Sequence, residues 1–482
     1  MLTSNPANMR TINGVKLAGL SLIFLTACSK YTDIKTQGAL VNGKLDNYSL
    51  LLNSTSNFAA GPSICDYASD DIQLVDGSNQ QKELAANTLS YDYYMNAYTW
   101  QPTIYAIASA NYQDYTWSNL YNSVTIANII VNEVPTVDDA TPAQQEPVIA
   151  QALVHRADAY LSLVNVYSKP YNRTTAGADL GVPLVLVQTT TQPLVRASVQ
   201  TVYDQILSDL RRAIPSLPPT QNFSFIPSKA SGYGVLARCF FYMNMYDSAA
   251  RYADSALAYK ATVLDLSTVT DPAMSYPQYF NNPEILLAKQ ARGYSGTTYG
   301  PATFRLSDTL LHVLGDDDQR YNLYTTTPEN ISFDYTDAGG RFFFMEGNVS
   351  NYNNRNVGVT VPEMMLIKAE YLARTGSANA AMDLVNQLRI KRIKQGSYVA
   401  LTATNADDAL VKVIQERQRE FFCRMLRWWD LRRLNSEARF QTTITRRFNG
   451  TTYTLARNSN RYVFPISEYN RRLNPEIEQN PR

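Results

Sequence analysis

The chain has 482 residues, of which 45% are hydrophobic, so it can bury a large core in one or two domains. Its formal net charge of +1 offers no general attraction for nucleic acid. Only two histidines occur, His155 and His312, and neither lies in an HExxH motif. Since glycine-rich phosphate loops and GxSxG motifs are also missing, we expect no catalytic residues, no cofactor and no metal.

A short apolar run, residues 17–27, ends at a cysteine near the start of the chain. It is too short to cross a bilayer, which needs about 20 apolar residues. Arg10 and Lys16 precede it, which is the order of a secretory signal. Residues 25–28, Leu-Thr-Ala-Cys, resemble the lipobox of bacterial lipoproteins, which implies cleavage before Cys28 and acylation of its thiol. An ordinary signal peptide with a chance cysteine is the alternative.

Cleavage would divide the chain into a signal peptide, residues 1–27, and one mature domain, residues 28–482. The mature domain loses two positive charges, so its net charge falls from +1 to −1. Three cysteines remain there, Cys65, Cys239 and Cys423, and no two are close enough in sequence to suggest a metal site. Because their number is odd, at least one thiol is expected to be free and buried.

Apolar residues recur at steps of three and four in several stretches, which predicts amphipathic helices. The single helices are expected over residues 117–134, 146–167 and 198–214, the last with Ser198 as its N-cap. Two further stretches are expected to be helical hairpins: residues 228–259, broken near 244–247, and residues 361–392, broken at Gly376. The hairpins loosely resemble tetratricopeptide units, which stack into curved scaffolds.

Long stretches between these helices are rich in Tyr, Asn, Gly, Ser and Thr and are expected to be irregular. They cover residues 58–103, 262–360 and 436–475, with a short strand at 341–347. Tyrosine, at 33 residues, combines an apolar face with a polar tip and suits half-wet binding surfaces. Loops of this length usually carry function, so we expect the ligand site chiefly in 58–103 and 262–360.

Residues 416–433, ERQREFFCRMLRWWDLRR, are expected to form one amphipathic helix. Phe421, Met425, Trp428 and Trp429 would share its apolar face. A basic nucleic-acid-binding helix is the rival interpretation, and the tryptophans together with the neutral chain argue against it.

This stretch closely resembles the C-terminal signature of the SusD/RagB family of nutrient-binding lipoproteins. The matching residues are Glu416, Arg417, Arg419, Glu420, Arg427, Trp428, Asp430, Leu431, Arg432 and Arg433. The family's early helices match at Trp117, Tyr121, Asn128, Arg156 and Ala157, and its end at Pro465, Ile466, Glu468, Asn474, Pro475, Gln479, Asn480 and Pro481. Residues 423–426 depart from the family pattern, and we expect a repacked helix contact there.

The resemblance implies a mainly α fold, a SusD-like helical scaffold of tetratricopeptide-like hairpins with long irregular loops and a few short strands. It also implies a binding protein and not an enzyme, held by its lipid on the outer face of the outer membrane. Such a protein would capture oligosaccharides or peptides and deliver them to a SusC-like TonB-dependent barrel. A lipidated helical-repeat scaffold for envelope assembly is one alternative. A glycan hydrolase is another, and would need two carboxylates about 5 to 10 Å apart.

The ligand residues are expected among exposed aromatic side chains, since sugars stack their apolar faces on such rings. Trp100 is the leading candidate, because Pro102 discourages helix at Gln101 and the ring would then project from a loop. Further candidates are Tyr98, Gln101, Tyr294 and Tyr299. Asp316 and Asp318 could in principle bind calcium, but a solvated turn is the preferred interpretation.

Overall fold

Helices dominate the computed structural model, which describes residues 43–108, 112–187, 193–269, 281–291, 302–331, 333–343 and 355–482. The helices of the first part are α1 (Leu45–Leu52), α2 (Thr55–Phe58), α3 (Ile64–Ala68), α4 (Asn79–Ala86), α5 (Thr88–Tyr98), α6 (Tyr115–Glu133), α7 (Pro142–Tyr167) and α8 (Val199–Ala213). Those that follow are α9 (Lys229–Tyr242), α10 (Tyr246–Tyr259), α12 (Asp308–Leu314), α13 (Gln319–Leu323), α14 (Val361–Arg374), α15 (Ala378–Arg389), α16 (Ala406–Phe421), α17 (Leu426–Leu434) and α18 (Glu468–Leu473).

The strands of the described residues are short and occur in pairs. The parallel pair is β1 (Ala60–Gly61) with β4 (Gln290–Ala291). The antiparallel pairs are β2 (Leu180–Pro183) with β3 (Arg196–Ser198), β5 (Thr325–Thr326) with β6 (Phe342–Phe343), and β7 (Ile444–Phe448) with β8 (Thr451–Leu455). The expected mainly α fold with a few short strands is therefore confirmed. Of the strand expected over 341–347, β6 covers two residues and positions 344–347 lie outside the described ranges.

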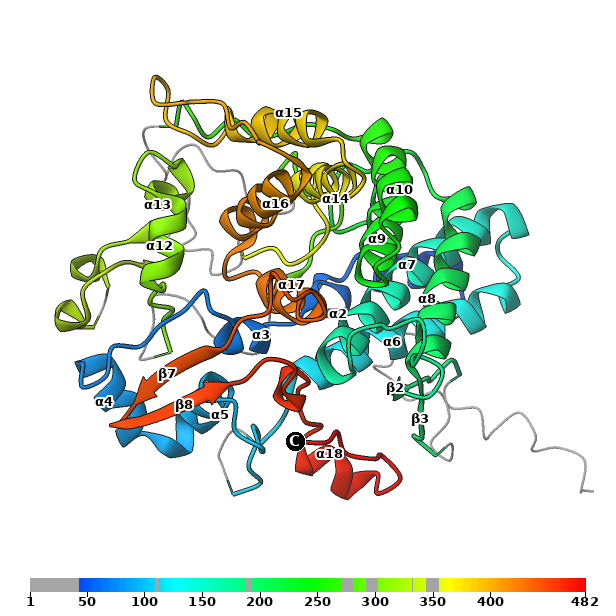
Figure 1. The fold of residues 1–482 in the computed structure, drawn as a ribbon. Coiled ribbons are helices and arrows are strands. Elements are labelled where there is room, and N and C mark those ends of the chain that lie inside the picture. Colours follow the sequence, from blue (N-terminus) through cyan, green and yellow to red (C-terminus); the bar gives the residue numbers. More distant parts are fainter. Residues whose placement is uncertain are drawn as a thin grey trace, which may run out of the picture. The chain divides into compact units, whose positions relative to one another are not determined.

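Helices α6 to α10 and α14 to α16 pack against one another in chain order and form the scaffold (Figure 1). The three single helices predicted from periodicity correspond to α6, α7 and α8, and the Ser198 hydroxyl caps α8 by accepting a hydrogen bond from the Thr201 amide at 3.1 Å. Both predicted hairpins are also confirmed, as α9–α10 and α14–α15. Their turns contain Asn244 and Gly376 at positive φ, 58° and 90°, a conformation that glycine and asparagine adopt most readily.

Residues 58–103 are helical for much of their length, so the expectation of an irregular loop there is wrong. Helices α3, α4 and α5 lie in this stretch. Its buried side chains include the tyrosines Tyr67, Tyr94 and Tyr98. Aliphatic residues at these positions would have produced a recognisable helical period, whereas tyrosines do not. The stretch also contacts the C-terminal part, because the Arg446 guanidinium of β7 donates to the Tyr67 carbonyl at 2.9 Å.

The signature stretch 416–433 is not one helix, contrary to the prediction. Helix α16 ends at Phe421 and α17 begins at Leu426, with Cys423 and Met425 at φ 53° and 64° between them. The amides that the break leaves free are bound by carboxylates from α3 and the residues after it: Asp66 accepts from Met425 N at 2.6 Å and Asp71 from Cys423 N at 3.1 Å. These partners stabilise a break that the local sequence does not reveal.

The stretches 262–360 and 436–475 are largely irregular where they are described, as expected. They also contain α12, α13, α18 and the β7–β8 hairpin. Among the described residues, no helix is both long and apolar enough to cross a membrane.

Buried ion pairs connect the irregular stretch 302–331 to the scaffold. Arg320 of α13 contacts Glu416 and Glu420 of α16 at 2.7 and 2.6 Å, and none of the three side chains is more than 3% exposed. Glu416 also pairs with Arg389 of α15 at 3.0 Å and with Arg419 at 3.1 Å. Burial by itself would raise the pKa of Glu416, but Arg320, Arg419 and Arg389 outweigh it and lower that pKa to about 2.

Replacement of Glu416 by glutamine is expected to lower the free energy of unfolding at pH 7 by about 3–5 kcal/mol, because it removes the carboxylate that Arg320, Arg389 and Arg419 share in a buried cluster. The carboxylate has a folded-state pKa of about 2, below its ordinary 4.5, so its stabilisation is complete above pH 4.5 and is lost as pH falls through 2. Melting temperatures measured from pH 7 to pH 2 should therefore fall less steeply for Glu416→Gln than for the wild type. The control is Asp383→Asn, an exposed change on α15. Equal melting temperatures for Glu416→Gln and the wild type at pH 7 would contradict the assignment.

Candidate functional site

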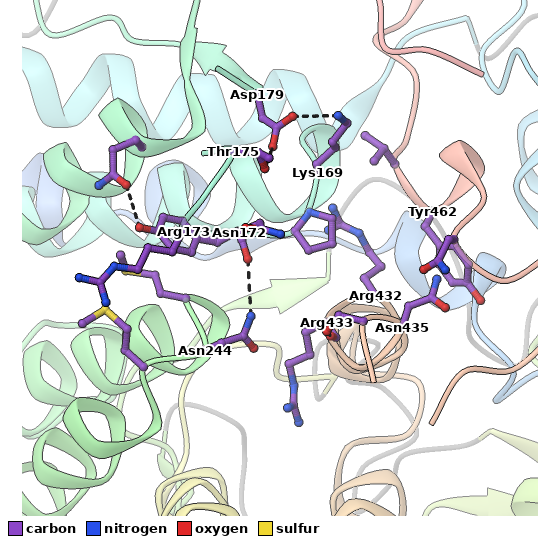
Figure 2. Close-up of a pocket in the computed structure, with 18 of the residues that line it drawn as sticks. Lys169, Asn172, Arg173, Thr175, Asp179, Asn244, Arg432, Arg433, Asn435 and Tyr462 are labelled. Atoms are coloured by element: carbon purple, nitrogen blue, oxygen red, sulfur yellow. Dashed lines mark hydrogen bonds and ion pairs between the residues drawn. The ribbon is translucent and has the colours of Figure 1, made fainter. Parts of the chain in front are cut away.

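A cavity of about 970 Å³ lies between the C-terminal end of α7, the α9–α10 turn and α17. Its volume is in the range of small-molecule sites, roughly 300–1,000 Å³. Side chains from five segments line it: residues 169–179, α8, 240–245, 432–436 and 458–463. We refer to it as the α17 cavity. Figure 2 shows that its polar side chains come from several sides and converge.

The segment that follows α7 forms one side of the α17 cavity. An ion pair between Lys169 and Asp179, 2.8 Å long, and a hydrogen bond from the Thr175 hydroxyl to Asp179 hold this segment in a loop (Figure 2). Burial raises the pKa of Asp179, but the hydrogen bonds from Lys169 and Thr175 outweigh it and lower that pKa below its ordinary value. Asp179 therefore remains ionised and paired.

The α9–α10 turn forms the opposite side. The amide of Asn244 approaches the Tyr171 carbonyl at 3.5 Å, which is long for a hydrogen bond (Figure 2). The Tyr171 hydroxyl donates to Gln200 of α8 at 2.7 Å, and its ring lies edge-on to Tyr203. These contacts join the turn, the loop and α8 around the cavity.

Helix α17 contributes two successive arginines, and they differ in their partners. Arg433 donates to both carboxylate oxygens of Glu370, each at 2.7 Å, and to Asp430 at 2.8 Å. Arg432 is 3% exposed, donates from Nη2 to the Ser168 carbonyl, and has no partner for Nε among the described residues. Burial lowers the pKa of Arg432 to about 10. In Figure 2, Arg432 lies among the lining side chains and Arg433 points away from them.

The lining is polar, and its charge is predominantly positive. Its described residues include the cations Lys169, Arg173, Arg211, Arg432 and Arg433 but a single carboxylate, that of Asp179. Amide and hydroxyl groups of asparagine, serine and tyrosine residues fill the space between the charges. Such a lining can bind a hydroxyl-rich ligand, and its charge favours an anionic one. The described ranges contain no group of three or more metal-ligating side chains.

Trp100, the leading ligand candidate, lies in the core, and the expectation of a projecting ring is wrong. Helix α5 does end before Gln101, as Pro102 suggested, but Trp100 occupies the left-handed position after it at φ 52°. The Trp100 amide donates to the Ala97 carbonyl at 3.2 Å, which turns the chain inward. The ring is 2% exposed, its Nε1 donates to the Ala68 carbonyl at 3.0 Å, and the Arg446 guanidinium lies 4.5 Å from its centre. It offers no free face to a sugar.

The other candidates are also placed away from the α17 cavity or are not described. Tyr98 is 1% exposed and its hydroxyl accepts from the Leu74 amide, so it too belongs to the core. Gln101 is half-buried and donates to Thr99 at 3.1 Å. Tyr294, Tyr299 and the lipidation candidate Cys28 lie outside the described ranges.

Asp318 is not part of a solvated turn, contrary to the preferred interpretation. It is 1% exposed, caps α13 by accepting from the Arg320 amide at 2.9 Å, and pairs with the Arg320 guanidinium at 2.6 Å. Asp316 is exposed. The cysteines fit their expectation, since Cys65, Cys239 and Cys423 are free and buried.

No sequence motif marks the α17 cavity. In the sequence, Arg432 and Arg433 stand out only through the family signature, and no motif distinguishes residues 169–179 or 458–463. The cavity forms because five segments that are far apart in sequence meet around the end of α17. Segment 458–463 contains two asparagines in six residues, but 169–179 contains one in eleven, so composition does not mark both turns.

Comparison with known proteins finds two family models that match different parts of the chain. A model described as "Starch-binding associating with outer membrane" matches residues 43–242, and one described as "SusD family" matches residues 318–482. The SusD-like protein P38 of Formosa agariphila is 23% identical over 419 residues, which cover 76% of this chain and 78% of that protein.

Solved structures share the fold over most of the chain. A SusD superfamily protein from Bacteroides thetaiotaomicron has a TM-score of 0.70 at 18% identity, covering 91% of this chain and 100% of its own. Surface glycan-binding protein A from Bacteroides uniformis has a TM-score of 0.66 at 15% identity, covering 90% of this chain and 99% of its own.

Trp100→Ala is expected to destabilise the fold by about 3–5 kcal/mol, because it removes a fully packed ring. Thermal or urea unfolding measures this loss, and Thr103→Ala, an exposed change three residues later, is the matched control with an effect within about 0.5 kcal/mol. A variant with wild-type stability would show that the ring is not packed in the core.

Proposed function

Because the chain belongs to the SusD/RagB family, we propose that it is a cell-surface lipoprotein that captures oligosaccharides and delivers them to a SusC-like TonB-dependent transporter. The observation that carries this proposal is the match of family models to both the N-terminal and the C-terminal part of one fold. Members of this family bind carbohydrates and are not enzymes, and this protein is accordingly a binding protein. The family is associated with the outer membrane.

An oligosaccharide is the proposed ligand in preference to a peptide. The descriptions of the matching family model and of a structural relative name starch and surface glycans. The polar lining of the α17 cavity is compatible with this ligand class, because its amides, hydroxyls and guanidinium groups can each pair with a sugar hydroxyl. The buried rings of Trp100 and Tyr98 have no part in the proposal.

Membrane attachment is proposed to occur through Cys28, in the lipobox of residues 25–28. A single acyl chain holds a protein only marginally, so we propose more than one chain on this cysteine. The protein would then face the exterior of the outer membrane, beside the transporter.

The alternative is a lipidated helical-repeat scaffold that assembles envelope proteins and binds no nutrient. The stacked hairpins α9–α10 and α14–α15 would suit that role as well. The large insertion between residues 262 and 360 favours the nutrient-binding role, since a repeat scaffold needs no such segment.

Acylation at Cys28 is expected to be detectable on the mature protein. Mass spectrometry of membrane-extracted protein should find a chain that begins at Cys28 and carries acyl groups. Cys28→Ser should lack them, whereas Ser29→Ala, which keeps the cysteine, should retain them. A mature chain that begins elsewhere with Cys28 unmodified would contradict the proposed anchor.

Affinity purification of the tagged lipoprotein from detergent-solubilised outer membranes is expected to recover a TonB-dependent barrel. The reason for this expectation is the family signature at 416–433 together with the helical scaffold of α6 to α10 and α14 to α16, which we propose as the docking surface. A tagged lipoprotein of another family is the control for unspecific capture. Recovery of periplasmic assembly factors without a barrel would favour the scaffold alternative.

A further inference from the structure

The α17 cavity contains a buried positive charge that the described residues do not neutralise. Arg432 is 3% exposed, and none of its described partners is a carboxylate. Removing a guanidinium from water is costly unless an anion or a full set of hydrogen bonds replaces the solvent. Arg433, the next residue, meets this requirement through Glu370 and Asp430.

Two other buried arginines without a close carboxylate satisfy the requirement in another way. Arg196 donates four hydrogen bonds to backbone carbonyls, at 2.7 to 3.0 Å. Arg446 donates to three backbone carbonyls and lies over the rings of Tyr98 and Trp100. Arg432 has one such bond, to the Ser168 carbonyl, and its Nε has no described partner. The Arg432 guanidinium therefore lacks both a carboxylate and a full set of acceptors among the described residues.

A second unpartnered group lies three residues after Arg432, at the C-terminal cap of α17. Asn435 is 7% exposed, lines the same cavity, and its side-chain oxygen is buried without a described hydrogen-bond donor. Residues three apart on a helix are neighbours on its surface, so Arg432 and Asn435 lie on the same side of α17. The cavity thus presents an unpartnered cationic donor and an unpartnered neutral acceptor next to each other.

We propose that the α17 cavity binds a carboxylate-bearing sugar, such as a uronic acid, with its carboxylate on Arg432 and a hydroxyl donated to Asn435. The carboxylate supplies the missing acceptor and counter-ion, and the hydroxyl supplies the missing donor. This inference rests on the proposed function for the sugar, and it narrows the ligand class to acidic oligosaccharides or their free acidic units.

The rim of the cavity supports an anionic ligand. Arg173 and Arg211 line it and are exposed, so they can attract an anion from solution without being committed to the fold. The one lining carboxylate, Asp179, is paired with Lys169 at 2.8 Å and opposes an anion only weakly.

Calorimetric titration of the mature protein with galacturonic acid is the test, with galactose as the neutral probe of the same shape. We expect galacturonic acid to bind and galactose to bind at least about tenfold more weakly, because a hydrogen bond to a charged group is typically worth 1.5–3 kcal/mol. The affinity should fall as NaCl is raised, since salt screens the rim charges. A trimer of galacturonic acid that binds more tightly than the monomer would identify an oligosaccharide chain as the source. Equal affinities for the trimer and the monomer of galacturonic acid would identify a free acidic sugar as the source.

Two variants test the proposed contacts with Arg432 and Asn435. Arg432→Gln should weaken galacturonic acid binding at least about tenfold. Asn435→Asp places a carboxylate on the neighbouring turn, where it can pair with Arg432; it should abolish binding while leaving the melting temperature equal or higher. This second variant keeps the test decisive if Arg432→Gln does not fold.

Two neighbouring arginines on α8 give a matched pair of variants, which tests whether exposed positive charge at the edge of the cavity attracts the ligand. Arg211→Gln removes a lining charge and should weaken binding about twofold to fivefold. Arg212→Gln removes the adjacent exposed charge, which does not line the cavity, and should leave binding unchanged.

Three results would overturn the inference. The first is equal affinity for galactose and galacturonic acid, and the second is full affinity in folded Asn435→Asp. The third is binding of acetate as tightly as galacturonic acid, which would reduce the cavity to a site for any small carboxylate. If one of these results is obtained but the protein still recovers the barrel and binds neutral oligosaccharides, this inference fails while the proposed function stands.

Discussion

Two hydrogen bonds of 2.7 Å join Arg433 of α17 to Glu370 of α14, and both side chains are buried. An ion pair of this kind contributes little net stability when it forms, but the loss of either partner leaves a buried charge and is severely destabilising. The pair therefore restricts how α17 can lie on the scaffold. The same constraint recurs between other segments, as the buried pairs Arg156–Asp209, Arg238–Glu363, Arg320–Glu416, Arg392–Glu420 and Arg417–Asp430. Segments distant in sequence are thus held in one arrangement by matched charge as well as by apolar packing.

The scaffold was predictable because its helices carry apolar residues at the helical period of three and four. Helices α6, α7 and α8 follow this pattern, and the hairpin turn at Gly376 carries its own local signal. Two parts were not predictable for physical reasons. Residues 58–103 bury tyrosines in place of aliphatic residues, and the break between α16 and α17 depends on Asp66 and Asp71, more than 340 residues earlier in the chain.

The candidate site was less predictable than the fold. An aromatic residue before a proline looks exposed from sequence, yet Trp100 turns inward at a left-handed position and its indole finds a carbonyl acceptor in α3. No local pattern carries that information, because both the turn and the acceptor belong to the tertiary structure. The α17 cavity is a further case, since each of its five lining segments is unremarkable alone. Such a site exists only through packing, and sequence reasoning reaches it only after the fold is known.

The family signature shows how structural and functional roles divide within one helix. Trp428 packs against Phe464, Asp430 pairs with Arg417 of α16 and Arg433 pairs with Glu370 of α14, so these three buried residues serve the fold. A shared scaffold of this kind leaves ligand choice to the residues that line cavities and loops. Arg432 belongs both to the signature and to the cavity lining. It lines the α17 cavity, and its Nε has no hydrogen-bond partner among the described residues. The scaffold can therefore supply the charge at the cavity floor, while neighbouring positions such as Asn435 decide whether that charge is neutralised internally or remains available to a ligand.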